Sequence, residues 1–140
     1  MPIHLVISLL ALIPVTILAD GKPYAPESID GVRIVTAEQA IELILDHPDM
    51  PIIDSRKKTE FVKGHIEGAV SLLDTEMTEQ LLQELVPDKD ATILFYCNGV
   101  RCLRSSNAIR KAQDWGYTSL VWFRGGWKEW TEKRLPVVTE

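Results

Sequence analysis

The sequence has few residues with which to build a metal centre. It contains two cysteines and three histidines among 140 residues. Structural zinc sites pair such ligands at short, regular spacings, and no such pairing joins the two cysteines to the histidines, which are His4, His47 and His65. The sequence also lacks a nucleotide or flavin motif. We therefore expect neither a metal nor another cofactor.

An excess of basic residues is also missing. Lys and Arg total 15 against 20 Asp and Glu, so the net charge is −5. Binding to nucleic acid requires a basic face, and we expect no nucleic-acid partner. The chain also lacks internal repeats and low-complexity tracts, and 140 residues suit one domain with its own core.

The first nineteen residues, "MPIHLVISLLALIPVTILA", contain no Asp, Glu, Lys or Arg. An apolar run that ends in a small residue, here Ala19, is typical of a secretory signal peptide. We therefore predict a signal peptide over 1–19 and a periplasmic or secreted protein. The alternative is an uncleaved membrane anchor, although the run is short for a span, and only this alternative brings a membrane partner. Residues 20–31, rich in Pro and Gly, are predicted to form a leader.

From residue 32 onwards, strand patterns alternate with helix patterns. The expected strands are 32–36, 51–54, 69–72, 91–96 and 119–123, and the main expected helices are 37–47, 74–86, 105–116 and 126–133. This alternation predicts one α/β domain over 32–140 with a mostly parallel sheet. Ligand sites of such sheets form where strands end and helices begin.

Both cysteines lie in one such loop, "CNGVRC", after the apolar run "ATILFY". A helix amino terminus and nearby cations lower the pKa of a cysteine, so we expect Cys97 to be a nucleophilic thiolate. The backbone N–H groups of the loop would form an anion site around it. The candidate anion-binding residues are Asn98, Gly99, Val100, Arg101, Cys102, Leu103 and Arg104. Such a site suits attack on a sulfur donor, or on phosphate or arsenate.

Two other interpretations of the cysteines remain open. A structural disulfide between Cys97 and Cys102 would suit an oxidising compartment, although closing so short a loop removes little chain entropy. Alternatively, Cys97 is an inert buried residue at the end of a strand, a common position for cysteine. Placement beside cations favours the nucleophile.

Three segments follow one another along the chain: "IIDSRKKTEFVKGHIEGAVSL", "LFYCNGVRCLRSSNAI" and "GYTSLVWFRGGWKEWTEKRLPV". In this order they resemble the rhodanese-like family over 30–140. The resemblance implies a five-stranded, mostly parallel sheet with helices on both faces. It also implies a single-domain sulfurtransferase in which Cys97 takes sulfane sulfur from a donor such as thiosulfate. The resulting persulfide would pass its sulfur to cyanide or to a thiol, including the thiol of a transient protein partner.

The resemblance also assigns roles to three residues outside the loop. Asp54 and Arg56 are expected to be structural and to tie the end of a strand to neighbouring backbone. His65 is expected to organise the corner between Gly64 and Gly68 rather than to act as a base.

The loop itself departs from the family pattern Cys-x-x-Gly-x-Arg-Ser/Thr. Cys102 stands where that arginine is usual, and Arg104 comes two residues later. Either the loop is longer or Arg101 supplies the cation. A longer loop resembles the dual-specificity phosphatases and arsenate reductases of this fold, whose Cys-x5-Arg spacing is not met. An oxyanion enzyme of that kind, or a non-catalytic module for sulfur carriage or docking, is therefore the alternative function.

The loop matches a two-cysteine variant of the family better. It resembles the pattern Cys-Asn-Gly-x-x-Cys-x-x-Ser found in a subset of rhodanese-like proteins. In that variant Cys102 is a candidate resolving cysteine, which would release sulfide from the Cys97 persulfide and leave a disulfide.

Overall fold

The structure, a computed structural model, describes residues 21–140 and contains one five-stranded sheet. The strands are Arg33–Ile34 (β1), Ile52–Asp54 (β2), Ala69–Ser71 (β3), Thr92–Tyr96 (β4) and Ser119–Phe123 (β5). Their order across the sheet is β1-β5-β4-β2-β3, and all neighbouring pairs are parallel. The predicted α/β fold with a five-stranded parallel sheet is therefore confirmed.

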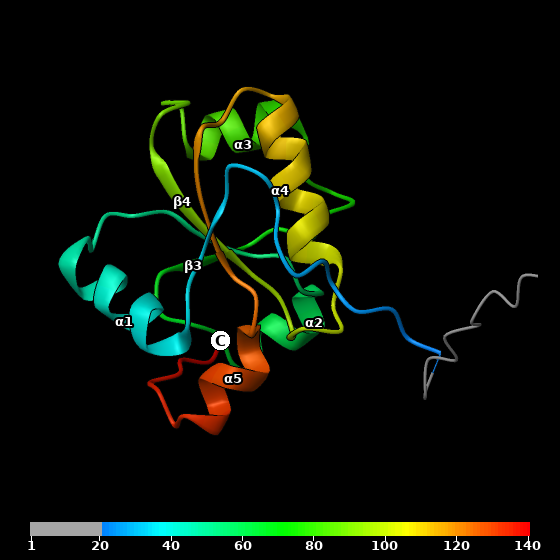
Figure 1. The fold of residues 1–140 in the computed structure, drawn as a ribbon. Coiled ribbons are helices and arrows are strands. Elements are labelled where there is room, and N and C mark those ends of the chain that lie inside the picture. Colours follow the sequence, from blue (N-terminus) through cyan, green and yellow to red (C-terminus); the bar gives the residue numbers. More distant parts are fainter. Residues whose placement is uncertain (1–20) are drawn as a thin grey trace, which may run out of the picture.

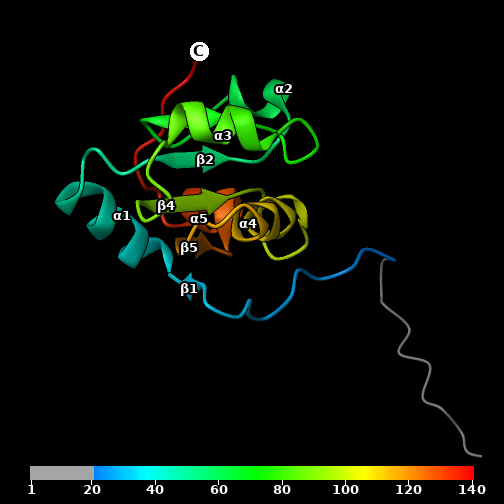
Figure 2. The same ribbon diagram turned by 90° about the horizontal axis from the view of Figure 1, so that it is seen from above.

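Helices cover both faces of the sheet. Figure 1 shows α3 (Glu79–Leu85) and α4 (Arg104–Asp114) on one side, and α1 (Ala37–Asp46) and α5 (Gly126–Glu132) on the other. Figure 2 shows α1 and α4 on opposite sides of β4 and β5. The short helix α2 (Lys58–Phe61) follows β2.

Two apolar clusters fill the space between the sheet and these helices. Phe95 and Trp122 belong to the cluster that packs on α3 and α4, whereas Leu94 and Val121 belong to the cluster that packs on α1 and α5. Successive strand residues point to opposite faces, so a strand covered on both faces is apolar throughout. For this reason the apolar run at 91–96 indicates a strand that is buried on both faces.

The predicted helix over 74–86 is wrong at its amino-terminal end, because α3 begins at Glu79. The Thr78 side chain caps it by accepting a hydrogen bond from the N–H of Leu81 at 3.2 Å. Lys111 of α4 donates from Nζ to the carbonyl oxygens of Asp74 (2.7 Å) and Met77 (2.6 Å). These carbonyls are therefore satisfied by another helix, which sequence periodicity does not reveal.

The part of the leader that the structure describes packs against the domain. Ala25 and Ile29 are buried in the cluster under α3 and α4, and Gln113 of α4 donates from Nε2 to the carbonyl oxygen of Asp30 at 2.7 Å. The predicted signal peptide or anchor at 1–19 lies outside the described residues. Within residues 21–140, each helix is too short or too polar to cross a bilayer.

Candidate active site

The loop that carries both cysteines leaves the middle of the sheet. It joins the carboxyl end of β4 to Arg104, the first residue of α4, and β4 lies between β2 and β5. Parallel sheets form their ligand sites at this edge. The placement of Cys97 directly after a buried central strand agrees with the sequence-based expectation.

Two backbone hydrogen bonds from the first turn of α5 hold the beginning of this loop in place. The N–H of Trp127 donates to the carbonyl oxygen of Cys97 at 2.8 Å, and the N–H of Lys128 donates to that of Asn98 at 2.9 Å. Gly126 has φ of +57°, and a Cβ there would collide with the backbone of Cys97. Only glycine fits both the conformation and the contact. This support was not predicted from the sequence, where its signal is the Gly125–Gly126 pair.

The sulfur of Cys97 is enclosed, since the residue is 1% exposed. Its Sγ lies 3.0 Å from Oγ of Ser105, and the N–H of Ser105 donates to it at 3.4 Å. The indole N–H of Trp122 donates to the same Oγ at 2.9 Å. Because Trp offers only a donor, the Ser105 hydroxyl is free to point its own hydrogen at Cys97. Neither Ser105 nor Trp122 was predicted to belong to the site. The signal for Ser105 in the sequence is a hydroxyl side chain in the first helical turn after the loop.

The pKa values of the two thiols are shifted in opposite directions, up at Cys97 and down at Cys102. Burial raises the pKa of Cys97, and the negative charge of Cys102 raises it further. A hydrogen bond from Cys97 lowers the pKa of Cys102 to about 6, helped by the backbone of Asn98 and by the backbone and charge of Arg104. We expected the low pKa at Cys97, but the structure gives it to Cys102. At Cys97, burial raises the pKa by more than the hydrogen bonds to Ser105 lower it.

Alkylation of the native protein by a neutral haloacetamide is expected to modify Cys102 before Cys97. The thiolate is the reactive form, so the Cys102 rate should rise as the pH increases through about 6. In Cys97→Ala the stabilising hydrogen bond is lost, and the midpoint should move up towards about 8.5. Peptide mapping across a pH series measures both midpoints. Identical profiles in the two proteins would contradict the effect of Cys97 on the pKa of Cys102.

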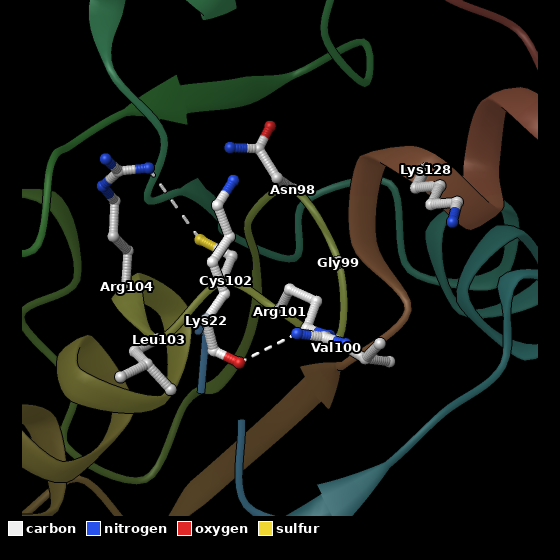
Figure 3. A pocket seen from close by; sticks show the side chains of 9 residues that line it. All are labelled: Lys22, Asn98, Gly99, Val100, Arg101, Cys102, Leu103, Arg104 and Lys128. Atoms are coloured by element: carbon white, nitrogen blue, oxygen red, sulfur yellow. Dashed lines mark hydrogen bonds between the residues drawn. The ribbon is translucent and has the colours of Figure 1, made fainter. Parts of the chain in front are cut away.

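A cavity of about 520 Å³ opens over the loop. Figure 3 shows the Cys102 sulfur in this cavity with Arg104 directed towards it. The lining residues are Lys22, Asn98, Gly99, Val100, Arg101, Cys102, Leu103, Arg104 and Lys128. The structure thus brings all seven predicted anion-binding residues together and adds two lysines, one from the leader and one from α5. Cys97 lies beneath this lining, next to Cys102.

The side chain of Arg104 approaches the sulfur of Cys102. Its Nη1 lies 4.0 Å from Sγ of Cys102. Arg101 instead stacks over the ring of Tyr24 at 3.8 Å and donates to the carbonyl oxygen of Lys22 at 2.8 Å. The geometry therefore agrees with the interpretation of a longer loop with a later arginine. Arg101 instead binds the leader to the loop.

Asp54 and Arg56 form a buried ion pair at the end of β2. Nη2 of Arg56 lies 2.7 Å from Oδ2 of Asp54, and their side chains are 2% and 0% exposed. The same Nη2 donates to the carbonyl oxygen of Gly64 at 2.7 Å, and the Tyr96 hydroxyl donates to Asp54. This network links β2, β4 and the corner before β3. It lies outside the lining of the cavity.

His65 is held within the corner at 64–68. Its Nδ1 lies 2.9 Å from the carbonyl oxygen of Phe61, and because a carbonyl only accepts, this nitrogen carries a proton. The ring stacks on Phe61 with centroids 3.7 Å apart.

The buried hydroxyl of Ser55, next to Asp54, has no hydrogen-bond partner among the described residues.

Comparison with known proteins matches this geometry to one family. The family model for the rhodanese-like domain matches residues 36–133. The uncharacterized protein YibN of Escherichia coli (strain K12) is 31% identical over 108 residues, which cover 76% of this chain and 73% of YibN.

Solved structures share the fold at lower identity. The polysulfide-sulfur transferase homodimer of Wolinella succinogenes superposes with a TM-score of 0.64 at 20% identity, over 79% of this chain and 80% of that one. Thiosulfate sulfurtransferase of Pseudomonas aeruginosa superposes with a TM-score of 0.62 at 20% identity, over 77% of this chain and 20% of that one. With a family match across most of the described residues, the chain belongs to the rhodanese-like domain family.

Proposed function

We propose that the protein is a sulfurtransferase that carries sulfane sulfur as a persulfide on Cys97. The donor is a small anion such as thiosulfate, and the acceptor is cyanide or a thiol. The observation that carries this proposal is a buried cysteine at the end of the central strand, in contact with Ser105 and adjacent to a cavity whose lining includes cations. Sulfur-transfer enzymes among the structural neighbours support the same reaction class.

The cavity suits an anionic donor. Lys22, Arg104 and Lys128 contribute positive charge to its lining, and opposite charges attract more strongly in a partly enclosed site than in open solvent. Backbone N–H groups of the loop add fixed dipoles, which bind anions at the start of a helix. The donor would therefore bind with its sulfane sulfur above the two cysteines.

Proton transfer between the cysteines activates the buried thiol. The thiolate of Cys102 accepts the proton of Cys97 as Sγ of Cys97 attacks the sulfane sulfur. The S–S bond of thiosulfate breaks, sulfite leaves with the bonding electron pair, and Cys97 becomes a persulfide anion. Ser105 stabilises the developing charge through its hydroxyl and N–H. Attack by cyanide on the outer sulfur then yields thiocyanate and the Cys97 thiolate, which takes its proton back from Cys102.

Sulfite release from thiosulfate tests this proposal, because it reports the first step whatever happens to the persulfide. Wild type is expected to release sulfite, and Cys97→Ser to lose this activity by about 10³-fold or more. The serine keeps the shape of the side chain but not the nucleophile. Turnover of an aryl phosphate without sulfite release would favour the oxyanion enzyme, and the absence of both activities would favour a docking module.

A further inference from the structure

Part of the active site comes from the leader, which precedes the segment that the rhodanese-like family model matches. Ala25 donates from its backbone N–H to the carbonyl oxygen of Val100 at 2.7 Å. Arg101 donates from Nη1 to the carbonyl oxygen of Lys22 at 2.8 Å and from Nη2 to the hydroxyl of Tyr24 at 2.9 Å. The leader is therefore bound directly to the loop that carries both cysteines.

The same part of the leader is also fixed to the end of β5. Arg124, the residue after β5, donates from Nε to the carbonyl oxygen of Pro26 at 2.8 Å and from Nη2 to that of Ala25 at 2.9 Å. Ala25 is buried, and Ile29 packs in the cluster under α3 and α4. These contacts give the leader a defined position beside the cavity.

Lys22 extends from this anchored segment into the cavity. Its side chain lines the cavity together with Cys102 and Arg104. Figure 3 shows this side chain running from the carbonyl group that Arg101 binds towards the part of the loop that carries Asn98. The leader thus adds a cation to a cavity that is otherwise built from the loop and the first turns of α4 and α5.

The charge of the donor decides how strongly it interacts with this cation. Coulomb energy is proportional to the product of the two charges, so a donor with two negative charges gains about twice as much from Lys22 as a donor with one. Thiosulfate carries two negative charges. A thiosulfonate, in which an alkyl group replaces one charged oxygen of thiosulfate, carries one. Both present a sulfane sulfur to Cys97, so they differ in charge and not in the reacting bond.

We propose that Lys22 is a specificity-determining residue that biases the site towards doubly charged sulfane donors over singly charged ones. This inference deepens the proposed function and rests on it, since it concerns the donor from which Cys97 takes its sulfur. The transfer step is the same for both donors: Sγ of Cys97 attacks the sulfane sulfur, Cys102 takes the Cys97 proton, and the S–S bond breaks. Sulfite leaves thiosulfate, and a sulfinate leaves a thiosulfonate, each with the bonding electron pair.

Tyr24 is a positioning residue for Lys22. The guanidinium of Arg101 lies 3.8 Å from the centre of the Tyr24 ring, and the Tyr24 hydroxyl accepts a hydrogen bond from it. Tyr24 is 55% exposed and lies outside the lining of the cavity. Removing its ring would leave the lysine charge in the protein but would weaken the contact that holds the leader against the loop.

The experiment measures thiocyanate formation from cyanide with thiosulfate or methanethiosulfonate as the donor, at low ionic strength, where charges are least screened. Lys22→Gln is expected to lower kcat/KM about 10-fold for thiosulfate and about 3-fold for methanethiosulfonate, because half the interaction energy gives the square root of the factor. The ratio of the two kcat/KM values should therefore fall about 3-fold. The loss should appear in KM, with kcat nearly unchanged, as for the removal of an interaction made equally with substrate and transition state.

Two control variants separate the charge of Lys22 from its position. Lys133→Gln removes the same charge at the end of α5, where Lys133 pairs with Glu38 at 2.9 Å outside the cavity, and it should leave the ratio unchanged. Tyr24→Ala keeps every charge and should lower the ratio in the same direction as Lys22→Gln, by a smaller factor. A wild-type ratio in Tyr24→Ala would overturn its positioning role.

The other outcomes distinguish this inference from the proposed function. An equal loss with both donors in Lys22→Gln, or no loss with either, would overturn the specificity role and leave the proposed function intact. A fall in the ratio as large in Lys133→Gln as in Lys22→Gln would overturn it too, because net charge would then be the cause. Wild type that forms no thiocyanate from either donor would overturn the proposed function, and the specificity role with it.

Discussion

Gly126→Ala is expected to destabilise the protein by about 2–5 kcal/mol. The alanine would have to keep a left-handed backbone conformation, and its Cβ would clash with packed atoms. The new Cβ would press on the carbonyl group of Cys97 and on the nitrogen of Gly99. Both are backbone atoms of the loop, so they cannot swing away as a side chain can. The loop and the start of α5 must therefore separate.

The same substitution should slow sulfite release from thiosulfate by about 10²-fold, since a displacement of about 1 Å at a reacting group costs that much. The carbonyl oxygen that would move is the one that accepts the N–H of Trp127, and it belongs to the nucleophile itself. Urea denaturation measures the stability loss, and sulfite release from the folded fraction measures the activity loss.

Gly125→Ala is the matched control. Gly125 has φ of −65°, which any residue adopts, and the atoms nearest to a Cβ there belong to the side chain of Glu129 rather than to backbone. The Glu129 carboxylate can rotate away and its Cβ, 3.0 Å from the new atom, needs only a small shift. The loss in free energy of unfolding should therefore be about 1 kcal/mol, less than at Gly126. A comparable loss at both positions would show that the loop contact at Gly126 is not the cause.

Arg56→Met is expected to lower the free energy of unfolding by about 3–5 kcal/mol, the usual cost of leaving one partner of a buried ion pair without the other. Asp54 is fully buried and would keep only neutral donors, among them the Tyr96 hydroxyl. The guanidinium also lies 4.5 Å from the ring of Trp127, so the variant loses a cation–π contact. Urea denaturation of wild type and variant measures the difference.

Two further variants test the origin of this loss. Lys58→Met removes an exposed ion pair with Glu140, whose side chain is 52% exposed, and should cost no more than about 1 kcal/mol. Adding Asp54→Asn to Arg56→Met removes the unpaired charge and should recover part of the stability. A double variant as unstable as the sum of its single variants would contradict a direct interaction.

Much of the fold could be predicted from the sequence. The strand at 91–96, the loop at Cys97 and the helix that follows are set by local patterns: a continuous apolar run, a polar loop and a helical periodicity. The amino-terminal end of α3 could not be predicted, because Lys111 of α4 satisfies the carbonyl groups of Asp74 and Met77. Contacts between residues far apart in sequence leave no local pattern.

The sequence by itself determined the order of the elements, the parallel sheet and the loop in which two thiols and two arginines meet. The tertiary structure decided which thiol faces the cavity, which one carries the charge and which arginine lies beside it. A pKa depends on burial and on nearby donors, and here the donors around the deeper sulfur include Ser105, oriented by Trp122 of β5. These residues come together only when the strands pair and the helices pack on them.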